Sequence, residues 1–332
     1  MQKKTPTEKL LQACRLGQQK AALRALGEGA DASAQLPWGS PLDVDGAGHT
    51  ALMLAVGSGM ASVAKALIAA GAGPNDAGIR GKTPLERSVG HPEALRLLLD
   101  SGADPNRKND FGRTALMEAC GLRAEPAKIP WSESRRTKMH VPDQAPSTNR
   151  EQALDSIRQL LAKGADASAE DPGGRTPAFF CVASGNCDAL REVAAAGGNI
   201  NSIAAAARGD KDRFSPIWLA CAYNKAAELE CLIELGANVA SPTEDGGLAM
   251  YEAVKGKYSR CVELLLSAGA APNRDAILEK LNRDIPFKEQ LIKEAMASFD
   301  AVIEARELSL AVRQVDGHAE PATAAAPIRR RI

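Results

Sequence analysis

Residues 83–106 read TPLERSVGHPEALRLLLDSGADPN, and this stretch decides the fold. It opens with Thr83-Pro84, a typical helix start, because threonine caps free backbone N–H groups and proline fits the first helical position. A leucine-rich segment follows and stops at Gly102, where glycine can adopt the left-handed conformation that ends a helix. The stretch therefore predicts a short helix, a turn, a second helix and a glycine stop.

The same signals recur along the chain. Glycine stops occur at Gly29, Gly71, Gly102, Gly164, Gly197, Gly236 and Gly269. Helix starts with threonine or serine occur about 21 residues upstream of most of them, at Thr50, Thr83, Thr114, Thr176 and Ser215. The shortest separations between glycines are 31 to 33 residues. A fixed period of this length predicts an array of repeats rather than two globular domains.

Small residues recur five positions after the helix starts. They are Ala55, Ser88, Ala119, Cys181, Ala220 and, by alignment, Ala253. Small side chains at one repeated position let neighbouring helices approach closely. A core of this kind needs few large rings, which agrees with the 4% aromatic content of the 332 residues.

The chain resembles the ankyrin-repeat family. Residues 45–52, DGAGHTAL, match the family's first-helix motif, and residues 102–106, GADPN, match the motif that follows its second helix. Seven units fit between about residues 5 and 273. The resemblance implies an all-α solenoid of stacked helix-turn-helix units with hairpin loops. It also implies a non-catalytic scaffold that binds a partner protein on its concave face.

One departure from the family is consistent. The histidine after Thr-Pro-Leu is replaced by Met53, Glu86, Met117, Phe179, Trp218 and Tyr251. We expect packing to replace the hydrogen bonds credited to that histidine. Phe179, Trp218 and Tyr251 lie in consecutive units, so they are predicted to stack as a column inside the core. A ligand-binding aromatic strip is the alternative.

Extra residues interrupt the period near 35–44, 122–150 and 204–209. The first two insertions contain Trp38 and Trp131, which either fold back on the scaffold or anchor a partner. The array is predicted to span 1–274, followed by capping helices at 275–315 and a disordered tail at 316–332. One face of the long final helix would carry Leu291, Ala295, Phe299, Val302 and Ile303. A dimerising helix is the competing interpretation, but a monomer is favoured.

Composition and motifs exclude most other classes. The chain has 41 Lys+Arg and 41 Asp+Glu, so its net charge is zero. Nucleic acids and anionic membranes attract proteins with a basic excess, so neither is an expected partner. The seven cysteines form no Cys-x-x-Cys pair, which favours a reduced, cytoplasmic location. We expect no catalytic residue, cofactor, metal site or small-molecule substrate. An enzyme built around His140 in the long insertion is a remote alternative.

The family resemblance places candidate binding residues on the hairpins and at the ends of the first helices, and the long insertion adds Trp131. They are Arg80, Lys82, Phe111, Arg113, Trp131, Arg175, Lys211, Phe214 and Tyr223. Arginines and aromatic residues are enriched where binding energy concentrates in protein interfaces. A microbial effector that acts on a foreign protein through the same face is the alternative function.

Overall fold

The computed structural model describes residues 4–37, 48–121, 150–205, 213–239, 249–271, 273–284 and 289–315. The predicted tail at 316–332 lies outside these ranges, as do Trp38, Trp131, His140 and Lys211. Among the described helices, none is both long and apolar enough to cross a membrane.

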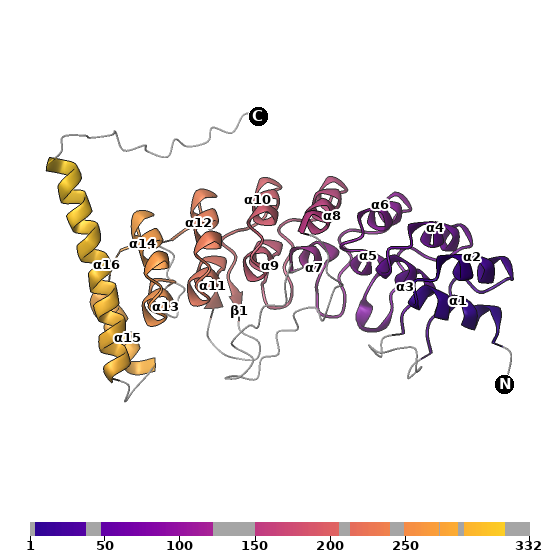
Figure 1. Cartoon of the computed structure of the whole chain (residues 1–332), viewed down its shortest axis with the longest axis horizontal. Helices are drawn as coiled ribbons and strands as arrows, with labels where there is room; N and C mark the ends of the chain where they lie inside the picture. The colour runs from indigo at the N-terminus through magenta and orange to yellow at the C-terminus, as the bar shows by residue number, and fades with distance from the viewer. Residues whose placement is uncertain are drawn as a thin grey trace.

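Within the described ranges, the first fourteen α-helices form seven consecutive pairs, stacked in two layers. The first helices of the pairs are α1 (Pro6–Arg15), α3 (Ala51–Gly57), α5 (Pro84–Arg87), α7 (Ala115–Gly121), α9 (Pro177–Ser184), α11 (Pro216–Ala222) and α13 (Ala249–Lys255). The second helices are α2 (Gln19–Gly27), α4 (Ala61–Ala69), α6 (Pro92–Asp100), α8 (Arg150–Ala162), α10 (Cys187–Ala195), α12 (Ala226–Glu234) and α14 (Ser259–Ser267). Each helix contacts its counterpart in the next pair, so the array is long and one pair deep (Figure 1).

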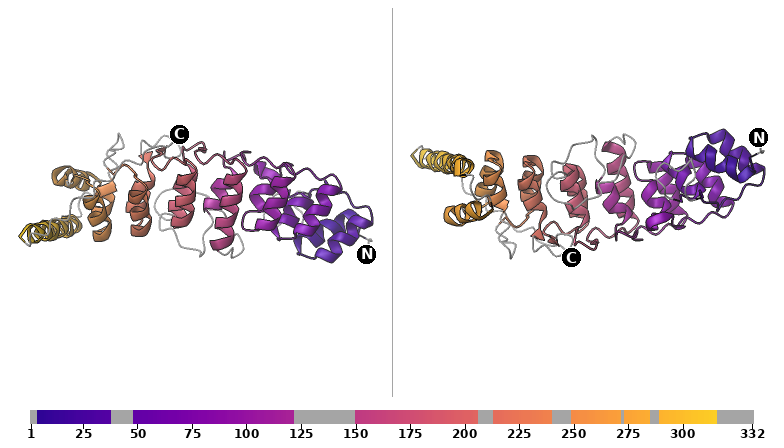
Figure 2. Two further views of the ribbon diagram at one scale, coloured as in Figure 1. Left: turned by 90° about the horizontal axis from the view of Figure 1, so that it is seen from above. Right: turned by 90° about the horizontal axis from the view of Figure 1, so that it is seen from below.

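Short connections join one pair to the next along one long edge of the array (Figure 2). They include the 3-10 turn η1 (Ile79–Gly81) and a hairpin of β1 (Ala204–Ala205) and β2 (Arg213–Phe214). The two strands are antiparallel, with Ala204 opposite Phe214. The insertion predicted near 204–209 begins in this hairpin, and residues 206–212 between the two strands lie outside the described part of the chain.

Most predicted helix boundaries are confirmed. The hydroxyl oxygens of Thr50, Thr83 and Ser215 accept hydrogen bonds from backbone N–H groups three residues later, at 3.1 to 3.2 Å. The glycine stops all have positive φ, from 82° at Gly236 to 97° at Gly71. Side chains rarely adopt these angles, so glycine is the residue that ends each second helix at low cost.

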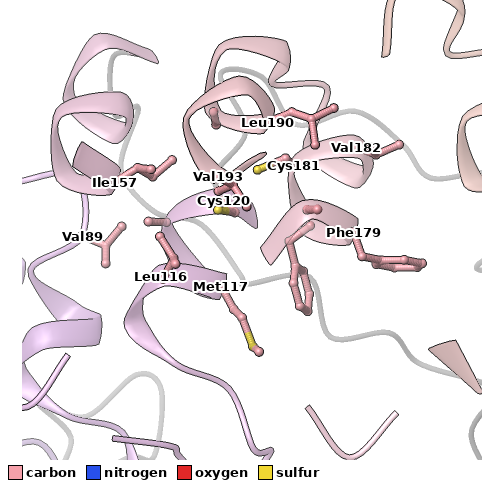
Figure 3. Close-up of a cluster of buried hydrophobic side chains, with 14 of the residues drawn as sticks. Val89, Leu116, Met117, Cys120, Ile157, Phe179, Cys181, Val182, Leu190 and Val193 are labelled. Atoms are coloured by element: carbon pink, nitrogen blue, oxygen red, sulfur yellow. The ribbon is translucent and has the colours of Figure 1, made fainter. Parts of the chain in front are cut away.

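The core lies between the two layers. The predicted column of small residues is confirmed, because Ala55, Ser88, Ala119, Cys181, Ala220 and Ala253 are all fully buried. Figure 3 shows such a cluster, in which Cys120, Ile157, Cys181, Leu190 and Val193 gather between neighbouring pairs. Few large side chains are needed because the helices pack closely around these small residues.

The predicted core position is confirmed for Phe179 and Tyr251, but the predicted stacking of the three rings is wrong. Phe179 and Tyr251 are buried, and Trp218 is half-buried, but the ring contacts in the described residues follow other pairings. Trp218 packs on Phe214 with ring centres 4.3 Å apart and the ring planes tilted by 44°, while Phe179 meets Phe180 edge to face. The hydroxyl of Tyr251 donates a hydrogen bond of 2.7 Å to the Asp284 carboxylate. Burial also leaves Phe179 and Tyr251 out of reach of a ligand.

Two further helices lie at the C-terminal end, α15 (Arg274–Asp284) and α16 (Glu289–Val315). Both pack on α13, and α16 also covers α14, crossing the end of the array (Figure 1). The buried face of α16 contains Ile292, Ala295, Met296, Phe299 and Val302. Leu291 was expected there but is 45% exposed, because the stripe begins one residue later. This packing supports the proposal that the region from 275 to 315 caps the array.

Candidate protein-binding face

The hairpins between consecutive pairs form the candidate face, and we call them the hairpin row. The row comprises residues 78–82, 109–113 and 171–175, together with the β1–β2 hairpin. In each of the first three, the N–H of the first residue donates to the carbonyl of the last, at 2.8 to 3.1 Å. Because the same backbone hydrogen bond closes each of them, these three hairpins have similar shapes.

Neighbouring hairpins touch each other directly. Gly81 has φ 67°, and a Cβ atom there would lie 2.6 Å from the carboxylate of Asp110. Gly112 has φ 69°, and its Cβ would lie 2.3 Å from Cδ of Pro172. The N–H of Asp110 also donates to the carbonyl of Arg80 at 3.0 Å. Glycine is required at both positions by close approach and by conformation, and the result is a continuous surface.

The hairpin at 109–113 is organised by Asn109, which is 6% exposed. Its side-chain oxygen accepts hydrogen bonds from the N–H groups of Phe111 and Arg113, at 2.9 and 3.1 Å. Its amide nitrogen donates to the Glu86 carboxylate of the preceding pair at 2.9 Å. Asn109 thus fixes the shape of its own hairpin and connects that hairpin to α5.

Asp171 has the same role in the next hairpin. One carboxylate oxygen accepts from the N–H groups of Gly173 and Arg175, at 2.9 and 3.0 Å. The other accepts from the Arg175 guanidinium, whose two nitrogens lie 2.6 and 2.7 Å away. The Asp171 side chain is fully buried, so this hairpin is closed by a charged pair rather than by an amide.

Glu86 is the buried acid of the face. It occupies the position of the family's missing histidine and is 8% exposed. Burial raises the pKa of Glu86 to about 7, and the nearby charge of Glu118 acts in the same direction. The hydrogen bond from Asn109 lowers this pKa but does not outweigh burial. The carboxyl of Glu86 therefore changes charge near neutral pH.

The cations of the face have three different environments. Arg113 was expected to be exposed, and the structure corrects this, since it is 6% exposed. Its guanidinium turns inward, 3.6 Å from the Glu118 carboxylate and 5.1 Å from the ring centre of Phe180. Arg175 is half-buried, and its guanidinium lies 5.7 Å from the centre of the same Phe180 ring. Arg113 therefore supports the hairpin and does not present its charge outward.

Arg80 and Phe111 have the predicted exposure, whereas Lys82 is only partly exposed. Arg80 is exposed at a hairpin tip and Lys82 is half-buried. Phe111 is 41% exposed, and the Arg80 guanidinium lies 5.9 Å from its ring centre. The structure thus brings together an arginine and an aromatic ring from two successive hairpins.

Phe214 and Tyr223 lie further along the array and are half-buried. Phe214 packs on Trp218, and burial raises the pKa of the Tyr223 hydroxyl to about 12. Each keeps part of its surface at the edge of the candidate face. Trp131 and Lys211, the two remaining predicted residues, belong to parts of the chain that the structure does not describe.

The structural residues of the face were not identified as such from the sequence. A signal was present, because Asn109 and Asp171 each precede a glycine by three residues and a hairpin arginine by four. Asparagine and aspartate favour turns because their side-chain oxygens accept the N–H groups that follow. Burial of Glu86 and Arg113 depends on contacts between pairs, which the repeat pattern does not specify.

The cysteines do not form a reactive centre in the described structure. All seven are free, and six of them are buried. Burial raises the pKa of Cys14 to about 12 and raises that of Cys231 to about 11. A raised thiol pKa lowers the fraction of nucleophilic thiolate. No group of three or more potential ligands in the described ranges could hold a metal ion.

Comparison with known proteins agrees with this architecture. Residues 10–109 match the family model of ankyrin repeats in three copies. A Treponema pallidum (strain Nichols) protein described as ankyrin repeat-containing is 38% identical over 97 residues. The match spans 27% of this chain and 33% of the length of that relative.

Solved ankyrin repeat domains have the same fold. That of Bcl-3, a member of the IkappaB protein family, has a TM-score of 0.54 and 22% identity, covering 78% of this chain and 97% of that domain. The human ASB11 domain has a TM-score of 0.52 and 22% identity, covering 74% of this chain and 98% of that domain. Residues 10–109 thus contain ankyrin repeats, and the stacked helix pairs of the described chain have the ankyrin-repeat fold.

Proposed function

We propose that this protein is a non-catalytic scaffold that binds a partner protein through its hairpin row and the adjoining ends of the first helices. Ankyrin repeats are in general protein–protein interaction modules, which supports the class of function. The observation that carries the proposal is the hairpin row itself. Buried polar side chains hold its shape, while an arginine and a phenylalanine lie exposed at its tips.

Rigidity is the property that makes this row suited to binding. Asn109 and Asp171 satisfy the backbone N–H groups of their hairpins internally, so a partner need not order them. A surface ordered before binding loses less conformational entropy in the complex. The contacts of Gly81 and Gly112 with the next hairpins extend this order along the row.

The residues proposed to meet the partner differ in accessibility. Arg80, Lys82 and Phe111 present side chains at the tips, whereas Phe214 and Tyr223 present only edges. Arg175 is engaged with Asp171 and contributes its outer surface. Arg113 is not proposed to contact a partner, because it is buried. A cytoplasmic location and a monomeric state belong to this proposal.

Affinity purification from the native host, followed by quantitative mass spectrometry, tests this function. The test variant combines Arg80→Glu and Phe111→Ser, both at exposed tips. The matched control combines Arg96→Glu and Leu23→Ser, exposed positions on the second helices α6 and α2. We expect at least one protein to be recovered with the wild type and the control but lost from the test variant. Equal recovery of every bound protein with all three chains would contradict the proposal.

A further inference from the structure

The tips of three successive hairpins form a small exposed strip of Arg80, Phe111 and Pro172, which we call the tip strip. Arg80 lies beside the Phe111 ring, at 5.9 Å from its centre. Gly112, next to Phe111, is so close to Pro172 that even a methyl group would clash there. The strip is therefore continuous from one hairpin to the next.

Arg80 has an unusual backbone conformation. Its backbone has φ 61° and ψ 25°, the left-handed region, and Gly81 follows with φ 67°. Residues with side chains rarely adopt this conformation, and glycine would do so without strain. Strained backbone in a native structure often accompanies function. Here the conformation places a guanidinium at the tip, over an aromatic ring.

The charges around the strip have a slight positive balance. Arg80 and Lys82 contribute positive charges, and the exposed Asp110 contributes a negative one. Lys108, just before the neighbouring hairpin, donates to the backbone carbonyl of Glu170 at 2.8 Å, and Glu170 itself carries an exposed carboxylate of the opposite charge. Arg175 is bound to Asp171 and so adds no unmatched charge. The excess positive charge lies at the Arg80 end, while Phe111 and Pro172 form the apolar end.

We propose that the tip strip binds an extended segment of a partner protein in which a carboxylate side chain adjoins an apolar or aromatic one. The carboxylate pairs with the Arg80 guanidinium, which offers a planar fork of N–H donors. The apolar side chain packs on the exposed face of Phe111 and against Pro172. This inference rests on the proposed function and specifies the chemistry of the partner at that face.

Selection of random twelve-residue peptides displayed on phage, with the full chain as bait, tests the inference. Selected peptides are then synthesised, and their affinity is measured by fluorescence anisotropy. We expect them to share one Asp or Glu next to an apolar residue. Arg80→Glu and Phe111→Ser should each weaken binding by about tenfold or more, the size of a hot-spot loss.

Two matched controls sharpen this test. Arg96→Glu and Leu23→Ser alter an exposed charge and an exposed apolar side chain on the second helices, and neither should change affinity. Changing the peptide's carboxylate to lysine should abolish binding to the wild type and restore it in the Arg80→Glu variant. Restored binding after the two charges are exchanged would show that residue 80 contacts the charged side chain of the peptide directly. A variant that had merely lost its fold would not regain binding.

Three results would overturn the inference. The selection yields no binding peptide, the selected peptides lack a carboxylate, or they bind the tip variants as tightly as the wild type. The proposed function can still hold if the selected peptides lack a carboxylate or ignore the tip variants. It holds if a host protein binds the wild type in the affinity purification but does not bind the Arg80→Glu, Phe111→Ser double variant. If the selected peptides bind as expected but no host protein is lost from the double variant, the chemistry inferred for the tip strip holds and the proposed scaffold function does not.

Discussion

The second-helix layer and the hairpin row use charged and polar side chains in opposite ways. On the second helices, ion pairs connect consecutive pairs of the array at the surface. They are Asp100–Lys163, Arg158–Glu192, Arg191–Glu234 and Glu230–Arg260, with N–O distances of 2.7 to 3.3 Å. In most of these residues, about half of the side chain is exposed. Exposed pairs of this kind typically contribute only ~0–1 kcal/mol each.

At the hairpin row, by contrast, the polar residues that hold the hairpins in shape are buried, together with Glu86 of the adjoining helix α5. Asp171, Asn109 and Glu86 are each less than 9% exposed, and each has hydrogen-bond partners in the protein. A buried polar group that loses its partner costs far more than an exposed one. The comparison teaches that the outer layer can change its charges at little cost, whereas the hairpin row depends on a few residues for its shape.

Replacing Asp171 with alanine should have the largest effect. The change removes the acceptor of two backbone N–H groups and of the Arg175 guanidinium. We expect the free energy of unfolding to fall by about 3 kcal/mol, since one partner of a buried charged pair is lost. Urea denaturation followed by circular dichroism measures this. Asp171→Asn retains one oxygen that can accept the backbone N–H groups, so its free energy of unfolding should fall less. Equal losses of stability in the two variants would assign the whole effect to the charge.

Asn109→Asp should place two carboxyl groups face to face. The new carboxylate can still accept from Phe111 and Arg113, but its second oxygen would meet Glu86, now 2.9 Å from the Asn109 amide nitrogen. We expect a loss of about 2 kcal/mol at pH 8 and a smaller loss at pH 5, where one proton can be shared. A loss that does not depend on pH would show that the two groups do not interact.

Glu86→Gln should alter the pH dependence of stability. The pKa of Glu86 is raised by burial from 4.5 to about 7, so the folded state holds a proton that the unfolded state has released. Stability of the wild type therefore falls as pH rises from about 4.5 to 7 and levels off above that. Relative to the wild type, the stability of the variant should rise by up to about 3 kcal/mol across this window. Denaturation midpoints at several pH values measure the difference, and a constant difference would refute the assignment.

Arg158→Ala, on the second-helix layer, should have the smallest effect. It removes the exposed pair with Glu192 and keeps the helix, because alanine favours the helical conformation. We expect a change in stability of about 0.5 kcal/mol or less, and a smaller one still in high salt. The same urea titration, with and without added sodium chloride, provides the measurement. A loss comparable to that of Asp171→Ala would remove the distinction between the two regions.

The sequence predicts the repeated parts of this fold well, for a local reason. Helix starts such as Thr50 and stops such as Gly102 are determined by a few neighbouring residues, and the structure has them where they were predicted. The buried small residues follow from the same register. Seven repetitions of a weak local signal make the architecture readable from sequence.

The candidate site was less predictable because it depends on contacts between pairs. Arg113 was predicted to be exposed, but Glu118 and Phe180 from α7 and α9 surround its guanidinium. The Glu86 carboxylate accepts from the Thr83 hydroxyl of its own repeat at 3.5 Å, and also from the Asn109 amide of the next hairpin at 2.9 Å. Trp218 packs at a tilt on Phe214, which the β1–β2 hairpin places beside it, and does not stack with Phe179 and Tyr251. The repeat period alone does not determine which side chains of neighbouring repeats contact each other.

Hydrogen–deuterium exchange on the complex with a partner purified from the host tests the central claim most directly. The hairpin-row account predicts slowed exchange in peptides that contain residues 78–82, 109–113 and 171–175. It predicts unchanged exchange in the second helices α6, α8 and α10. Protection confined to those second helices, with the hairpin peptides unaffected, would contradict it.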